Sequence, residues 1–197
     1  LPGAAAIPAA DADHERMVMH AGVRAVELAW EQLKPSQILT RASFLNAVTI
    51  VLASGGSTNA PIHLIAMARR AEVELTLADF ERLSLEVPLL LDLMPAGRHL
   101  MQDLFMAGGL PALMRRLGAR IHAGCLTVTG RTIAQNIAPV RAGRGDEARS
   151  NAGAPAAPAD AAPWIDDDVI RPLDKPVSMK PAISVLQGNL APDGCLI

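Results

Sequence analysis

The sequence predicts a mostly helical unit over residues 1–140, a linker over 141–163 and the first strands of a β-rich unit over 164–197. In the first unit, apolar residues recur every three or four positions, which is the spacing of a helix with one buried face. The linker has no Val, Leu, Ile, Met or aromatic residue, so it has too little apolar surface to offset the entropy of ordering. Beyond it, short alternating runs end at turn residues, as in β-hairpins.

The composition limits the class of protein. Half of the 197 residues are hydrophobic, which suffices for the core of one ordinary domain, and only 3% are aromatic. The formal net charge is −2 without a cluster of Lys and Arg, so we expect no nucleic-acid partner. The apolar runs are too short to span a membrane, so we expect no membrane partner. Cys125 and Cys195 lie far apart in the sequence, which argues against a disulfide framework and fits the reducing cytoplasm.

The first helix is expected over residues 11–34, with Asp11 or Asp13 as its N-cap. It should end before Pro35, because the residue that precedes a proline is driven out of the helical region. The row expected to face the core is Met17, Ala21, Ala25 and Leu28.

A second helix is expected over residues 41–54, with Thr40 as its N-cap and two consecutive glycines at its end. A third should begin with Asn59 as its N-cap. Its run over 62–68 is apolar on almost every side, which predicts that this helix is among the most buried.

Residues 75–84 predict a further helix from its N-terminal signals. Thr76 and Asp79 have the spacing of a capping box, and Leu75 and Phe80 have that of a hydrophobic staple. The remaining expected elements are short helices over 94–109, 110–120 and 131–138, a short strand that leads into a Thr-Gly turn over 125–130, and strand-and-turn segments over 167–176 and 182–194.

The sequence GGSTN, residues 55–59, is the one candidate ligand site. Glycines permit a close backbone approach, the helix start favours an anion, and Ser57, Thr58 and Asn59 can form hydrogen bonds. The alternative is a structural turn with a capped helix, which has the same residue types. Both interpretations stay open at this point.

The other residues that could bind a ligand or a metal have simpler structural explanations. His63 is expected to be a core histidine on an apolar helix, and Cys125 a small buried hydrophobe. The carboxylates at 166–168 are typical of a solvated charge run, and the five histidines lack metal-site spacing. We therefore assign no catalytic residue and no metal ligand in this segment.

Eight stretches, in this order, resemble one family of enzymes: LPGAAAIPA, LTRASFLNAV, GGSTNAPIHLIAMAR, LTLADFERLS, DLMPAGRHLMQDLFMAGGLPALM, LTVTGRTIAQN, VIRPLDKP and LQGNLAPDG. They look like the middle of the dihydroxy-acid/6-phosphogluconate dehydratases. The resemblance implies an α/β fold class. Residues 1–140 would be the mostly helical C-terminal portion of a large α/β domain, and 164–197 the first strands of a β-barrel domain.

The resemblance also implies a reaction. Members of this family are hydro-lyases that dehydrate a 2,3-dihydroxy carboxylic acid to a 2-keto acid, with an iron–sulfur cluster, Mg²⁺ and a serine base. The motifs that carry these parts have no match in this sequence, so the chain alone is expected to be inactive. In such an enzyme, Ser57, Thr58 and Asn59 would line or support the substrate cavity, or act only as a cap.

Several alternatives stay open. The stretches VELAWEQLKP and PWIDDDVIRPLDKP look more like sugar-acid dehydratases, which we favour, whereas GCLTVTGRT looks equally like the dihydroxy-acid enzymes of branched-chain amino acid synthesis. A non-catalytic helical binding module is the alternative of another class. The family resemblance further implies a homo-oligomer, such as a dimer, and the type of cluster is left open.

Overall fold

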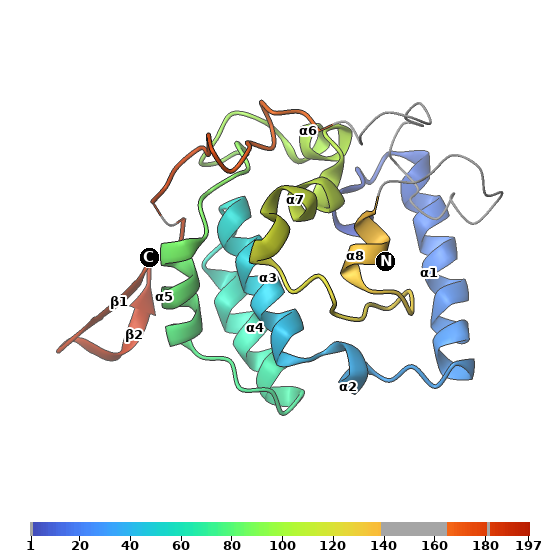
Figure 1. The fold of residues 1–197 in the computed structure, drawn as a ribbon, viewed down its shortest axis with the longest axis horizontal. Coiled ribbons are helices and arrows are strands. Elements are labelled where there is room, and N and C mark those ends of the chain that lie inside the picture. Colours follow the sequence, from blue (N-terminus) through green and yellow to red (C-terminus); the bar gives the residue numbers. More distant parts are fainter. Residues whose placement is uncertain (1, 139–164, 181) are drawn as a thin grey trace.

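A computed structural model describes residues 2–138, 165–180 and 182–197. These residues form a helical body and a small β-hairpin (Figure 1). The expected linker over 141–163 lies outside the described residues. The elements are α1 (Ala12–Trp30), α2 (Pro35–Ile38), α3 (Arg41–Ser54), α4 (Asn59–Arg70), α5 (Leu77–Glu86), α6 (Met101–Met106), α7 (Gly109–Leu117), α8 (Ile133–Ile137), β1 (Val185–Gly188) and β2 (Ala191–Leu196), with 3₁₀ turns at Ala4–Ala6 and Gly118–Arg120.

Helix α3 lies against α4 and α5 and has the predicted start and end. The Ser43 backbone N–H donates to Thr40 Oγ1 (3.3 Å), and the Thr40 N–H donates to Ser43 Oγ (2.9 Å). At the other end, Gly55 has a φ of 65°, a left-handed conformation that suits glycine. Phe44, Val48 and Leu52 form one buried face of α3.

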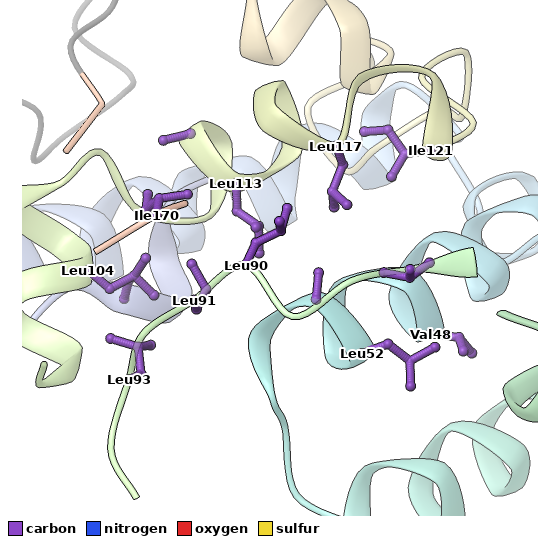
Figure 2. Close-up of a cluster of buried hydrophobic side chains, with 14 of the residues drawn as sticks. Val48, Leu52, Leu90, Leu91, Leu93, Leu104, Leu113, Leu117, Ile121 and Ile170 are labelled. Atoms are coloured by element: carbon purple, nitrogen blue, oxygen red, sulfur yellow. The ribbon is translucent and has the colours of Figure 1, made fainter. Parts of the chain in front are cut away.

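The core forms around an extended segment, residues 87–93, which follows α5. Figure 2 shows this segment carrying Leu90 and Leu91 between α7, with Leu113 and Leu117, and α3. Leu90, Leu113 and Leu117 have no exposed surface. A segment between two helices thus supplies the centre of the core.

The prediction that α4 is among the most buried helices is wrong. Ile62 is 63% exposed and Met67 is 51% exposed, and only Pro61 and Ala68 are buried. Its N-cap is Thr58 and not Asn59, a shift of one residue. An apolar run all around a helix does not specify which face is covered. Here α3 covers one face of α4 and leaves much of the other open.

The buried row expected on α1 is also largely wrong. Met17 is buried and Leu28 is half-buried, but Ala21 and Ala25 are exposed. The predicted N-cap is confirmed: the Asp13 N–H donates to an Asp11 carboxylate oxygen at 2.8 Å. Helix α1 runs along one side of the molecule (Figure 1), away from the packed centre.

A polar contact replaces much of the apolar packing expected for α1. The Arg24 Nε–H donates to the Val128 carbonyl at 2.7 Å. The same guanidinium pairs with Glu27 (3.0 Å) and Glu31 (2.6 Å). This arginine attaches the helix to the turn after Cys125.

The Thr-Gly turn expected within 125–130 is present, but of the expected strand only the bridge between Leu126 and Thr132 forms. The Thr127 N–H donates to the Arg131 carbonyl, and the Asn136 side-chain amide donates to Thr127 Oγ1 at 2.8 Å. Threonine and asparagine side chains that bond nearby groups favour turns over strands. The following short helix, α8, is confirmed.

Other expected elements agree with the structure in part. Helix α5 has its capping-box bond, with the Thr76 N–H donating to an Asp79 carboxylate oxygen at 3.1 Å. The helix expected over 94–109 begins only at Met101, whereas the one over 110–120 is confirmed as α7. The antiparallel hairpin expected over 182–194 forms as β1–β2 and extends to Leu196, but 167–176 makes only the bridge between Ile170 and Leu91. The described residues are thus helical with one small sheet.

Candidate functional site

Close packing around the two glycines of the candidate site leaves little room for a Cβ atom. A Cβ at Gly55 would lie 3.0 Å from a Leu89 methyl carbon. A Cβ at Gly56 would lie 3.0 Å from a Val51 methyl carbon and 3.3 Å from the Val51 carbonyl oxygen. The Gly56 N–H also donates to that oxygen at 2.9 Å and closes the end of α3. The glycine pair therefore permits a tight turn whether or not a ligand is present.

The three polar residues after the glycines are exposed but differ in role. Ser57, one residue before the Thr58 N-cap, supplies the capping bonds of α4: its Oγ accepts from the Asn59 N–H at 3.2 Å, and its carbonyl accepts from the Ala60 N–H at 2.9 Å. Within the described residues, the Thr58 hydroxyl and the Asn59 side-chain amide have no hydrogen-bond partner. These two side chains remain free to contact a ligand.

The start of α4 has few backbone donors left for an anion. The N–H groups of Asn59 and Ala60 are already bonded to Ser57, and Pro61 has no N–H. In the described residues, the backbone N–H groups of Ser57 and Thr58 have no hydrogen-bond partner, so an anion at this helix start would depend on those two donors. Anion binding by the backbone here stays a prediction.

An apolar groove of about 470 Å³ runs along α4 from its first turn. Ile62, Ile65 and Ala66 form one wall, and Cys195 and Leu196 of β2 contribute to the other. Arg69 lies at the groove as its one charged residue. The polar side chains of the GGSTN turn thus precede an apolar groove that ends beside a cation.

A second cluster of charged side chains lies outside the region that the sequence singled out. Asp92 is only 6% exposed and accepts from the Arg98 N–H and Nε–H, both at 2.9 Å. Arg171 lies 3.7 Å from the same carboxylate, and Asp168 lies 3.3 Å from Arg171 and 3.7 Å from Arg98. The hydrogen-bonded Arg98 guanidinium lowers the pKa of Asp92, while burial acts in the opposite direction.

This cluster predicts a pH dependence of stability. Because the pKa of Asp92 is lower in the folded chain than in the unfolded one, its contribution is present above the unfolded pKa of about 3.9 and is lost as the pH falls through the folded pKa. Asp168, Arg98, Arg171 and His99 are the other ionisable groups around it.

We expect Asp92→Asn to flatten the loss of stability as the pH falls below about 5. Urea unfolding at several pH values, compared with Asp193→Asn on the hairpin, measures this. Equal slopes of the free energy of unfolding against pH for wild type and Asp92→Asn would contradict the lowered pKa of Asp92 as the cause.

The structure does not gather metal ligands from the side chains that it describes. Over residues 2–138, 165–180 and 182–197, no three His, Cys, Asp or Glu side chains lie close enough to hold an ion. His63 is exposed, so its expected place in the core is wrong. Cys125 is half-buried as a free thiol, and burial raises its pKa; Cys195 is exposed. These residues do not by themselves fit an iron–sulfur cluster or Mg²⁺.

Among residues 2–138, 165–180 and 182–197, no helix combines the length and the hydropathy that a bilayer crossing requires.

Comparison with known proteins identifies the family. Residues 1–136 match the model of the dihydroxy-acid/6-phosphogluconate dehydratase N-terminal domain. The whole chain is 40% identical to a dihydroxy-acid dehydratase of Nocardioides sp. and 40% identical to a 6-deoxy-6-sulfo-D-gluconate dehydratase of Pseudomonas putida, covering 32% and 31% of those proteins. A dihydroxy-acid dehydratase of Methylibium petroleiphilum is 43% identical over 87% of the chain and 28% of its own length.

The chain thus spans about a third of the length of the curated relatives it matches. The match to the family model covers more than half of the chain, and the similarity to dehydratases continues to its end. The chain belongs to the dihydroxy-acid/6-phosphogluconate dehydratase family.

Proposed function

We propose that a longer protein containing this chain is a hydro-lyase that dehydrates a 2,3-dihydroxy carboxylic acid to a 2-keto acid. The substrate class that we favour is a sugar acid. The observation that carries the proposal is the 40% identity over the whole chain to relatives named as dehydratases of a dihydroxy acid and of a sulfo-sugar acid. The second candidate substrate is the dihydroxy acid of branched-chain amino acid synthesis, because its dehydratases are equally similar.

A direct comparison of substrates decides between the two. We expect the longer protein to form 2-keto acid from D-aldonates at a higher kcat/KM than from 2,3-dihydroxyisovalerate. Turnover of the isovalerate alone would reject the sugar-acid assignment and keep the dehydratase assignment. Turnover of neither acid by the cofactor-loaded protein would favour the non-catalytic binding module.

The family resemblance implies that an iron–sulfur cluster and Mg²⁺ supply Lewis-acid chemistry when they are bound. The described residues do not gather a ligand set for either group, so we assign no ligand in this chain. The large α/β domain and the β-barrel belong to the same proposal, in which α1–α8 are part of the former and β1–β2 open the latter. The boundaries at 140 and 163 stay predictions.

We infer that Thr58 and Asn59 contact the substrate and that Ser57 positions them. The inference is supported by the exposed and unbonded side chains of Thr58 and Asn59 and by the cap that Ser57 forms. A hydroxyl and an amide can hydrogen-bond a substrate carboxylate or hydroxyl. The apolar groove that begins at Ile62 would then contact the less polar part of the substrate.

Single substitutions in the longer protein separate these roles. We expect Thr58→Ala and Asn59→Ala to lower kcat/KM by about tenfold or more, because each removes a hydrogen bond to a charged or polar substrate. Ser57→Ala should in addition lower the free energy of unfolding by about 1 kcal/mol through loss of the cap. Arg70→Ala, at the exposed far end of α4, is the control. Unchanged kinetics for both Thr58→Ala and Asn59→Ala would leave only the capping role.

The proposed protein is a cytoplasmic homo-oligomer. The compartment is proposed because Cys125 and Cys195 are free thiols. Association is supported by exposed apolar residues on one side of α1, which include Met19 (61%), Val23 (60%) and Trp30 (83%).

A further inference from the structure

Residues 165–178, which we name the strap, lie alongside the extended segment 87–93 of the helical body. Two pairs of backbone hydrogen bonds join them. The Asp92 N–H donates to the Val169 carbonyl (3.1 Å) and the Arg171 N–H to the Leu90 carbonyl (2.8 Å). Farther along, the Leu89 N–H donates to the Ser178 carbonyl and the Val177 N–H to the Leu89 carbonyl, both at 2.9 Å. The strap therefore binds the body as an added strand would.

The strap also fills the core of the body. Ile170 has no exposed surface and Val169 is 4% exposed. Figure 2 shows Ile170 in the same buried cluster as Leu104 and Leu113, which come from α6 and α7. Without Ile170, this cluster would hold a cavity at its centre.

The charged side chains of the helical body and of the strap are complementary. The body presents the buried acid Asp92 and the base Arg98, and the strap presents Arg171 and Asp168. Arg171 faces Asp92 at 3.7 Å, while Asp168 faces Arg98 at 3.7 Å. Arg116 of α7 pairs with Asp167 of the strap as well. This pattern aligns the strap in one register, because a shift along the segment would bring like charges together.

We propose that segment 87–93 with Arg98 is a recognition surface for the strap, and that the two bind each other without needing the covalent connection through residues 139–164. The strap is then a part of the helical body, contrary to a domain boundary at residue 163. The surface binds an extended segment. In that segment two buried aliphatic residues, Val169 and Ile170, are followed by a basic residue and flanked by acidic ones. This inference does not depend on the proposed enzymatic activity.

A cut chain tests the proposal. A specific protease site is inserted between residues 150 and 151 of the whole chain, which is folded first and cleaved afterwards. We expect the two pieces to elute together on size exclusion at micromolar concentration. Ile170→Ala should speed their dissociation at least about thirtyfold, and Lys175→Ala, an exposed strap residue, should leave it unchanged. Separation of the wild-type pieces after the cut would overturn the proposal.

Hydrogen exchange on the uncut chain provides a second measurement that needs no variant. The amides of Leu89, Asp92, Arg171 and Val177 donate across the contact and should exchange as slowly as those in the middle of α3. Exchange of these four amides as fast as that of exposed loop amides would also overturn the proposal.

Discussion

Phe80→Ala is expected to lower the free energy of unfolding by about 3–5 kcal/mol. Phe80 lies on α5 with no exposed surface, and Leu75, its expected staple partner just before that helix, is also buried. Removing the ring leaves a cavity that the surrounding core can close only in part. Urea or thermal unfolding of the chain measures the loss.

Leu85→Ala on the same helix is the matched control. Leu85 is 79% exposed, so its truncation should change the free energy of unfolding by less than about 0.5 kcal/mol. Equal losses for Phe80→Ala and Leu85→Ala would mean that α5 does not bury the face described above.

Gly97→Ala is expected to destabilise the chain by about 3 kcal/mol through a backbone clash. A Cβ at this position would lie 2.6 Å from the Leu93 nitrogen, and closer still to the Asp92 carbonyl carbon and carboxylate. The loop would have to move away from Asp92, which also accepts hydrogen bonds from the N–H groups of Arg98 and His99. The measurement is again equilibrium unfolding.

The same substitution at Gly22 should have the opposite sign. Gly22 lies in the middle of α1, and a Cβ there would meet nothing within 4 Å. Alanine is a better helix former than glycine by about 0.5–1 kcal/mol, so Gly22→Ala should stabilise the chain. A Gly97→Ala variant as stable as wild type would show that the loop around Asp92 is not held as closely as the structure has it.

Features that depend on a few neighbouring residues were predictable from the sequence. The caps at Thr40 and Thr76 and the left-handed end of α3 at Gly55 need only their own turn, and all three are confirmed. The hairpin at 185–196 is equally local, since its two strands are joined by a short turn.

Features that depend on distant segments were not predictable. The open face of α4 follows from which neighbours cover it, which its own apolar run does not encode. Asp92 meets Arg171 across 79 positions of chain, and nothing in the spacing of either residue indicates the contact. The close approach of this loop to Asp92 requires the missing Cβ of Gly97.

The candidate site was found in part. The sequence placed polar residues at the start of α4, but it could not tell that Ser57 and Pro61 together leave the first turn with few backbone donors. That distinction needed the position of each hydrogen bond. It favours the side chains of Thr58 and Asn59 as ligand contacts in the proposed function.

The most direct test of the proposed function is the mass of the product formed by the cofactor-loaded longer protein from a 2,3-dihydroxy acid. We predict a 2-keto acid that has the composition of the substrate less one water, with no change in oxidation state overall. Unchanged substrate from both the aldonates and 2,3-dihydroxyisovalerate, or a product that keeps every oxygen atom, would contradict the assignment as a hydro-lyase.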